Sequence, residues 1–103
     1  MISVVIPTYK EPDYLDVCIE SILSGQKHKN EVVVVVDGTK DINQQVLDKY
    51  KDKITAIVFE ENYGQIKATN IGVCSSSNKN ILIVNDDNVF PKDWDSILLG
   101  NYD

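Results

Sequence analysis

Two adjacent carboxylates, Asp86 and Asp87, follow the aliphatic run at residues 81–84 after a single intervening residue, Asn85. At the end of a buried strand two such groups repel each other, and keeping both ionised is costly unless a cation lies beside them. Their hard oxygen atoms suit Mg²⁺ or Mn²⁺, which commonly bridges protein carboxylates to a diphosphate. The pair therefore predicts a divalent-metal site. The alternative, an ordinary Asx-turn that caps the next helix, stays open at this point.

Three more polar segments follow aliphatic runs, at residues 7–11, 37–41 and 60–64. Turns are polar in most proteins, so each segment alone says little. In open parallel sheets, however, ligands bind outside the carboxyl ends of the strands. We therefore expect the side chains of these segments to gather with Asp86 and Asp87 at one edge of a sheet.

The elements that must position these segments alternate between strand and helix. Four short aliphatic runs, at residues 2–6, 32–36, 54–59 and 81–84, lack polar alternation, which is typical of strands buried on both faces. Helical patterns lie between and after them, at about residues 12–25, 41–50, 65–75 and 91–99. The alternation predicts an α/β fold, a three-layer, Rossmann-like open parallel sheet with helices on both faces.

Composition excludes several classes of protein. The chain has 103 residues, a formal net charge of −6, a pI of about 4.6 and 43% hydrophobic residues, which fits one globular domain. The acidic balance argues against a nucleic-acid partner. The longest apolar run, residues 32–36, is far shorter than the roughly 20 residues of a membrane span. No basic stretch precedes an apolar one after Met1, so we expect no secretory signal. Cys18 and Cys74 lie among aliphatic residues at helical spacing, so we expect two buried thiols and a cytoplasmic protein.

Familiar phosphate-binding motifs are absent from the sequence. No Gly-x-Gly-x-x-Gly follows the first aliphatic run, and no Gly-x-x-x-x-Gly-Lys-Ser/Thr occurs anywhere, which excludes a P-loop nucleotide hydrolase. A phosphate-receiver domain shares the expected topology, but its acidic pair would follow the first strand rather than the fourth. It is kept as an alternative.

Five short segments together carry a family resemblance. In chain order they are Val-Val-Ile-Pro-Thr-Tyr-Lys at 4–10, Val-Val-Val-Asp-Gly-Thr at 34–39, Glu-Asn-Tyr-Gly at 61–64, Ala-Thr-Asn-Ile-Gly at 68–72 and Ile-Leu-Ile-Val-Asn-Asp-Asp-Asn at 81–88. With them the chain resembles the N-terminal, nucleotide-binding half of a family-two glycosyltransferase with the GT-A fold. The resemblance implies the strand order 3-2-1-4 and one nucleotide-sugar-binding domain over residues 1–103, shorter than full-length members of the family.

The resemblance also implies a role for residues in each segment. Thr8 and Tyr9 would line the base pocket, with the Tyr9 ring stacked on the base. Asp37 would accept a hydrogen bond from a base N–H, which favours uridine or thymidine donors, so that a UDP-sugar is the favoured partner. Lys67 would help to hold a phosphate, and the alternative for it is a solvated helix lysine.

For the metal, the resemblance implies that Asp87 ligates Mn²⁺ or Mg²⁺ and that Asp86 reaches the ribose, the metal or its bound water. Such a metal neutralises the charge that develops on the leaving nucleoside diphosphate. The chain departs from the usual family pattern at three positions. Asn85 stands where the commoner acidic triple has its first acid, and Val36 stands where many members have the first of two acids before the Gly-Ser/Thr turn. Thr69 stands where an Arg is frequent. These departures weaken any inference about the preferred nucleotide.

The catalytic base is the main element that the resemblance does not supply. In inverting members of the family it lies in the acceptor half, downstream of the metal motif, and Asp93, Asp95 and Asp103 match no family base. Two hypotheses follow: a glycosyltransferase that transfers a sugar to an unknown acceptor, and a non-catalytic binding module that lacks the acceptor half.

Strand order also bears on assembly. In the order 3-2-1-4 the third and fourth strands are both edges, and open edges invite pairing with another chain. We therefore expect a homodimer formed through the fourth strand that buries Trp94 or the face of Ile81.

Overall fold

The computed structural model describes residues 1–38 and 40–100; Thr39 of the expected Asp-Gly-Thr turn and Asp103 lie outside them. Strands and helices alternate in the order β1 (Ile2–Thr8), α1 (Pro12–Gly25), β2 (Glu31–Val36), α2 (Lys40–Lys49), β3 (Thr55–Val58), α3 (Gln65–Ser75), β4 (Asn80–Ile83) and α4 (Trp94–Gly100). No helix in these described ranges is both long enough and apolar enough to cross a membrane.

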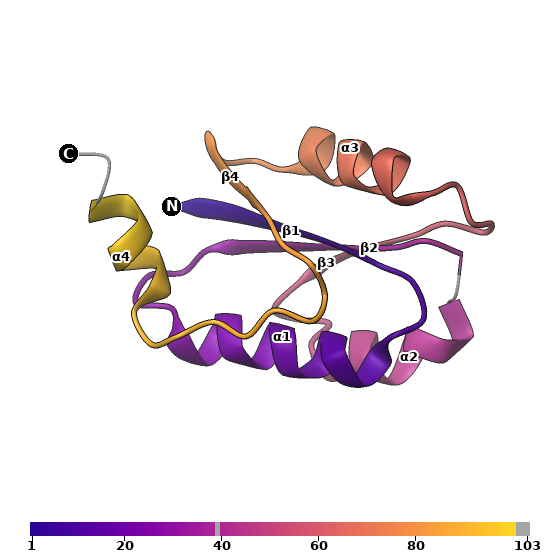
Figure 1. Ribbon diagram of the computed structural model, residues 1–103, viewed down its shortest axis with the longest axis horizontal. Coiled ribbons are helices and arrows are strands. Elements are labelled where there is room, and N and C mark those ends of the chain that lie inside the picture. Colours follow the sequence, from indigo (N-terminus) through magenta and orange to yellow (C-terminus); the bar gives the residue numbers. More distant parts are fainter. Residues whose placement is uncertain (39, 101–103) are drawn as a thin grey trace.

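The four strands form one parallel sheet in the order β3-β2-β1-β4, which confirms the predicted α/β fold and strand order. Helix α3 covers one face, and α1 and α2 cover the other, so the sheet is the middle of three layers (Figure 1). Val5 is paired with Val33 of β2 on one side and with Ile83 of β4 on the other. In this register the carboxyl ends of β1, β2 and β4 point to the same edge of the sheet.

The core is divided between the two faces by the two-residue period of the strands. Val4, Ile6 and Val34 face α1, where they contact a buried stripe of that helix made of Leu15, Cys18, Ile19 and Ile22. Val5, Val33 and Val35 face α3 and pack against Ala68. Uninterrupted Val and Ile in β1 and β2 are therefore required on both faces.

Helix α3 lies close to the sheet at Gly72. A Cβ atom at Gly72 would be 2.4 Å from Cγ1 of Val5, so only glycine permits this approach. Close packing here, together with Ala68 one turn earlier, fixes where the first turn of α3 meets the carboxyl ends of the strands.

Two expectations about the helices are wrong. Helix α4 begins at Trp94 rather than Pro91, because Asp93 has φ 61° and its backbone N–H donates to the Gly25 carbonyl over 2.7 Å. The second error concerns the thiols: Cys18 is buried, but Cys74 is exposed. Cys74 lies two residues after Gly72, a spacing that turns it away from the face of α3 that packs on the sheet.

Strand β4 is an edge of the described sheet, as the expected dimer through this strand requires. Trp94 is only 2% exposed and its indole Nε1–H donates to the Ile22 carbonyl over 2.9 Å, so burial of Trp94 in an interface is wrong. Ile81 is 39% exposed and Ile83 is 53% exposed. Association through this edge stays a prediction that depends on these two side chains.

The prediction is tested by light scattering across a concentration series. We expect the mass to rise towards that of a dimer, and Ile81→Lys to return it to a monomer because a charge on an edge strand opposes pairing. Ile66→Lys, on the 82% exposed Ile66 of α3, serves as the matched control. A monomeric mass at every concentration would contradict the prediction.

Candidate functional site

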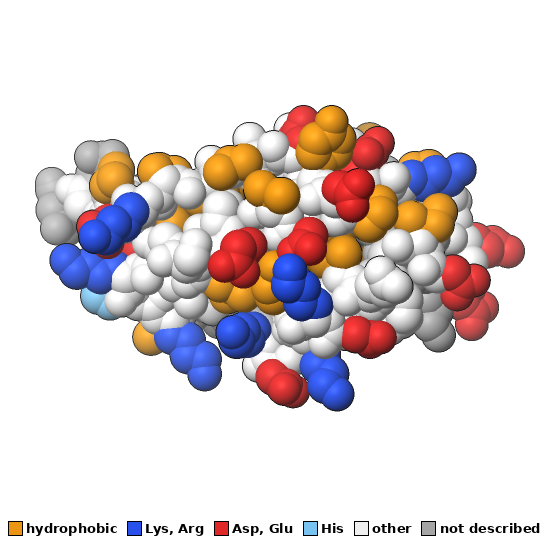
Figure 2. Space-filling model, turned by 90° about the horizontal axis from the view of Figure 1, so that it is seen from below, with side chains coloured by type: hydrophobic (Ala, Val, Ile, Leu, Met, Phe, Trp, Pro, Cys, Tyr) orange, Lys and Arg blue, Asp and Glu red, His pale blue; other side chains and the backbone are white. Residues whose placement is uncertain are grey.

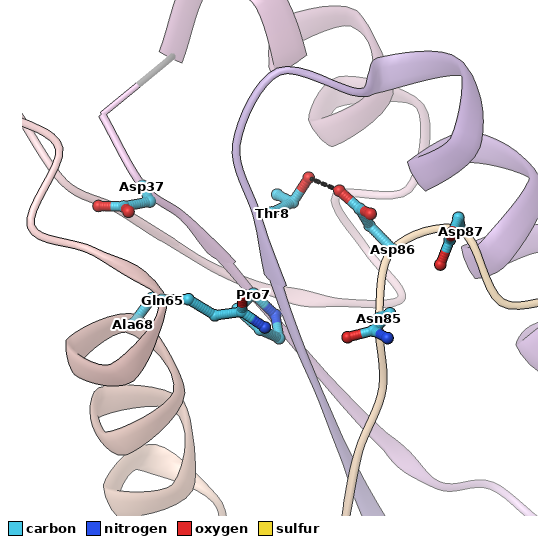
Figure 3. Close-up of a pocket in the computed structure, with 8 residues that line it drawn as sticks. All are labelled: Pro7, Thr8, Asp37, Gln65, Ala68, Asn85, Asp86 and Asp87. Atoms are coloured by element: carbon cyan, nitrogen blue, oxygen red, sulfur yellow. Dashed lines mark hydrogen bonds between the residues drawn. The ribbon is translucent and has the colours of Figure 1, made fainter.

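A pocket of about 250 Å³ lies where the carboxyl ends of the strands meet the start of α3 (Figure 3). Its lining comes from four places in the chain: Pro7 and Thr8 of β1, Asp37 after β2, Gln65 and Ala68 of α3, and Asn85, Asp86 and Asp87 after β4. The expected convergence of polar segments at one edge of the sheet is thus confirmed. Acidic side chains are also exposed at this end of the molecule, to the right in Figure 2.

Asp86 is held by the last residue of β1. The Thr8 hydroxyl donates to Oδ2 of Asp86 over 2.8 Å, from a side chain that is itself buried. Thr8 and Asp86 point towards each other, with Asp87 beyond Asp86 and Asp37 on the opposite side of Thr8 (Figure 3). The hydroxyl engages one carboxylate oxygen and leaves Oδ1 for another ligand.

The turn that carries the two carboxylates is closed on itself. The Asn88 backbone N–H donates to the Asn85 carbonyl over 3.2 Å, and the Asn85 backbone N–H donates to Oδ1 of Asn88 over 3.1 Å. Because α4 begins only at Trp94, Asp86 and Asp87 cap no helix. The Asx-turn cap considered from the sequence is therefore wrong.

Among the described residues, neither Asp86 nor Asp87 forms an ion pair with a cationic side chain; the ion pair in that part of the chain joins Lys49 to Asp16. Their negative charge reaches the core: burial, followed by the charges of Asp86 and Asp87, raises the pKa of the Cys18 thiol to about 12. The described residues contain no group of three or more metal-binding side chains. Two carboxylates nevertheless fit Mg²⁺ or Mn²⁺, since such ions are usually bound by one or two carboxylates and complete their shell with phosphates and water.

Asp37 holds the segment that leads into α3. Its Oδ1 accepts from the Tyr63 backbone N–H over 2.7 Å, and its Oδ2 accepts from the Gly64 backbone N–H over 3.0 Å. Gly38 has φ +86°, and a Cβ there would be 2.5 Å from the Asn62 backbone nitrogen. The turn after β2 is thus built to receive the loop after β3, a use of Asp37 that its sequence motif did not reveal.

Two of the predicted site residues lie outside the pocket lining. Tyr9 is 40% exposed, with Nζ of Lys10 4.9 Å from its ring centroid, and hydrogen bonds with Asn62 and Lys10 lower its pKa. Lys67 places its Nζ 4.2 Å from the ring centroid of Tyr63. The structure therefore brings together Thr8, Asp37, Asp86 and Asp87, but not Tyr9 or Lys67.

Sequence reasoning assigned no ligand role to Pro7, Gln65 or Ala68, which also line the pocket. The position of Gln65 in the sequence could have indicated its place in the site, because Gln65 is the first residue of a helix that follows a polar loop. That place brings the side chain to the carboxyl edge of the sheet.

Comparison with known families agrees with this architecture. The family model described as Glycosyl transferase family 2 matches residues 3–103. The chain belongs to glycosyl transferase family 2. Membership overturns the receiver-domain alternative.

Relatives of this family-two chain are longer. A Rickettsia bellii glycosyltransferase is 37% identical over 91 residues, covering 86% of this chain and 13% of the relative. Glycosyltransferase GlyG of Streptococcus pneumoniae is 30% identical over 118 residues, covering 99% of this chain and 39% of its own length. TarS 1-349 of S. aureus, solved in complex with UDP, superposes with a TM-score of 0.85 at 27% identity over 96% of this chain and 31% of TarS 1-349. This family-two chain therefore spans well under half the length of these proteins.

One acidic residue near the end of this family-two chain has a structural use. Asp95 is fully buried and accepts hydrogen bonds from the backbone N–H groups of Lys27 and His28, from the Asn30 side chain and from Ser96. Burial alone would raise the pKa of Asp95, but these hydrogen bonds outweigh it and lower the pKa to about 2. Asp95 joins α4 to the loop between α1 and β2 and is absent from the pocket lining.

Asp95 should make stability depend on pH. Because its pKa in the folded chain lies below the ordinary 3.8, its contribution is complete above about pH 5 and is lost as the pH falls through about 2. The shift corresponds to about 2 kcal/mol. Urea unfolding should show Asp95→Asn destabilised by this amount at pH 7 and much closer to wild type at pH 2.5. An equal difference at both pH values would contradict this.

Proposed function

We propose that this family-two chain binds a nucleoside diphosphate sugar, preferably a UDP-sugar, through Mn²⁺ or Mg²⁺ at Asp86 and Asp87. The observation that carries the proposal is a pair of carboxylates without a cationic partner in the described chain, in the same pocket as Asp37. One of the pair, Asp86, is held by the Thr8 hydroxyl. The similarity to TarS 1-349 in complex with UDP supports the choice of nucleotide.

The described side chains divide the work of binding. Asp86 and Asp87 would hold the metal, which when bound neutralises the negative charge of a leaving diphosphate. Asp37 would accept from a base N–H with the lone pairs that its two backbone contacts leave free. Tyr9 is an exposed residue that directly follows β1, and its ring would stack on the base. Lys67, in the first turn of α3, would approach a phosphate.

We propose sugar transfer as the reaction of the longer proteins of this family, in which a domain like this one is only a part. In an inverting single displacement, the acceptor oxygen attacks the anomeric carbon as the bond to the diphosphate breaks, while a base removes the acceptor proton. Within the described residues, the carboxylates that line the pocket are Asp37, Asp86 and Asp87. All three are assigned to the donor, so the base and the acceptor site would come from elsewhere.

A binding module without turnover is the second candidate. The pocket of about 250 Å³ is below the roughly 300–1,000 Å³ usual for small-molecule sites, which favours a donor site that is completed by other residues. Transfer assays with a UDP-sugar separate the candidates, since a module binds the donor but releases no UDP. A cytoplasmic location stays a prediction of either candidate.

Calorimetric titration with UDP in the presence of Mn²⁺ tests the proposal. We expect saturable binding that is lost with a chelator and is weakened at least about tenfold by Asp87→Ala, because the metal loses a ligand. Asp52→Ala removes an exposed carboxylate in the turn after α2 and should bind as the wild type does. No binding by the wild type, or equal binding by Asp87→Ala, would refute the proposal.

A further inference from the structure

The segment that carries Asp86 and Asp87 follows one stripe of helix α1. Its contacts with the helix fall at spacings of i, i+3, i+4 and i+7. Two of them use helix side chains: Cys18 Sγ contacts the Asn85 carbonyl at 3.8 Å, and Ser21 Oγ accepts from the Phe90 N–H over 2.9 Å. The other two use helix carbonyls: that of Ile22 accepts from Trp94 Nε1 over 2.9 Å, and that of Gly25 accepts from the Asp93 N–H over 2.7 Å. This spacing places all four partners on one side of the helix. The segment is therefore fixed along its length by α1.

Ser21 links this stripe to Phe90, three residues after Asp87, through its side chain. Its hydroxyl donates to the Cys18 carbonyl over 2.8 Å and accepts from the Phe90 backbone N–H over 2.9 Å. The Phe90 ring packs edge-on against Trp94, with ring centroids 5.0 Å apart. Without the hydroxyl, a partly buried N–H would lose its acceptor, which is costly.

The carboxylates lie between two fixed points. On one side, Val84 extends the ladder by donating to the Val5 carbonyl over 2.9 Å, and Thr8 holds Asp86. On the other side, Phe90 is held by Ser21, and Asp87 lies between them without a hydrogen-bond partner of its own in the described chain. The position of Asp87 thus depends on the turn being held at both ends.

We propose that Ser21 is a positioning residue for the metal-binding carboxylates, acting through the Phe90 backbone. The ligand readout of this inference rests on the proposed function, whereas its conformational readout does not. Removal of the hydroxyl should leave the fold intact and loosen the turn of residues 85–90.

Three variants separate positioning from general stability. Ser21→Ala removes the hydroxyl and Ser21→Thr restores it. Ser76→Ala is the matched control, because Ser76 also donates to a carbonyl one turn earlier, that of Gly72 over 2.8 Å, at the end of α3 far from the pocket. Nitrogen-15 NMR of the ligand-free chain should show faster exchange of the Phe90 amide, about fivefold or more, and shifted Asp86 and Asp87 amides in Ser21→Ala alone.

Titrations with Mn²⁺ and UDP, and with uridine without metal, complete the test. Ser21→Ala should weaken Mn²⁺-UDP binding about fivefold and leave uridine binding unchanged, and Ser21→Thr should recover the wild-type affinity. Unchanged Asp86 and Asp87 amides, or an equal loss of uridine affinity, would overturn the inference. If the wild type binds no nucleotide, the proposed function fails, and the NMR comparison still decides the role of Ser21.

Discussion

The placement of two adjacent carboxylates, Asp86 and Asp87, without a cationic partner among the described side chains is the constraint on which the site depends. The two carboxylates follow a strand of the sheet and have no cation among the described side chains. Burial raises the pKa of the Cys18 thiol, and the charges of Asp86 and Asp87 add to that effect. Carboxylate oxygens of this kind are the ligands that Mg²⁺ and Mn²⁺ prefer. The hydrogen bond from Thr8 and the closed turn of residues 85–88 keep the carboxylates in place.

Two other aspartates, Asp37 in the pocket lining and Asp95 away from it, show a different use of a carboxylate. Asp37 and Asp95 are both buried, and each is surrounded by backbone N–H donors. Around Asp95 these hydrogen bonds outweigh burial and lower the pKa to about 2 without a cation. Asp95 attaches α4 to the loop before β2, and Asp37 attaches the start of α3 to the end of β2. Aspartate is thus used in two ways in this chain: Asp37 and Asp95 join segments through backbone N–H donors, whereas Asp87 has no such donor among the described residues.

Much of this arrangement could be predicted from the sequence because it follows from periodicity. Unbroken Val and Ile in two runs demand a sheet covered on both faces, and the carboxyl-edge rule then gathers Thr8, Asp37, Asp86 and Asp87. The family resemblance supplied the strand order, which the structure confirms. Three-dimensional partners could not be predicted in the same way. Nothing local to Asp37 indicates that Tyr63 and Gly64 donate to it.

The errors have the same origin. The start of α4 depends on the left-handed backbone of Asp93 and its bond to Gly25, a contact between residues far apart in the sequence. Exposure of Cys74 depends on which face of α3 packs, and that is decided by the close approach of Gly72 to Val5. Lys67 lies over the ring of Tyr63, which belongs to the loop before α3, and its role at a phosphate stays a prediction.

The central claim is that Asp86 and Asp87 form a metal site that acts together with a nucleoside diphosphate. Crystals of the chain grown with UDP and Mn²⁺, measured with X-rays at the manganese absorption edge, test it most directly. The account predicts an anomalous peak within bonding distance of an Asp87 oxygen and of the diphosphate, in the pocket beside Thr8. A nucleotide bound in this pocket without manganese, or manganese bound away from both carboxylates, would contradict the account.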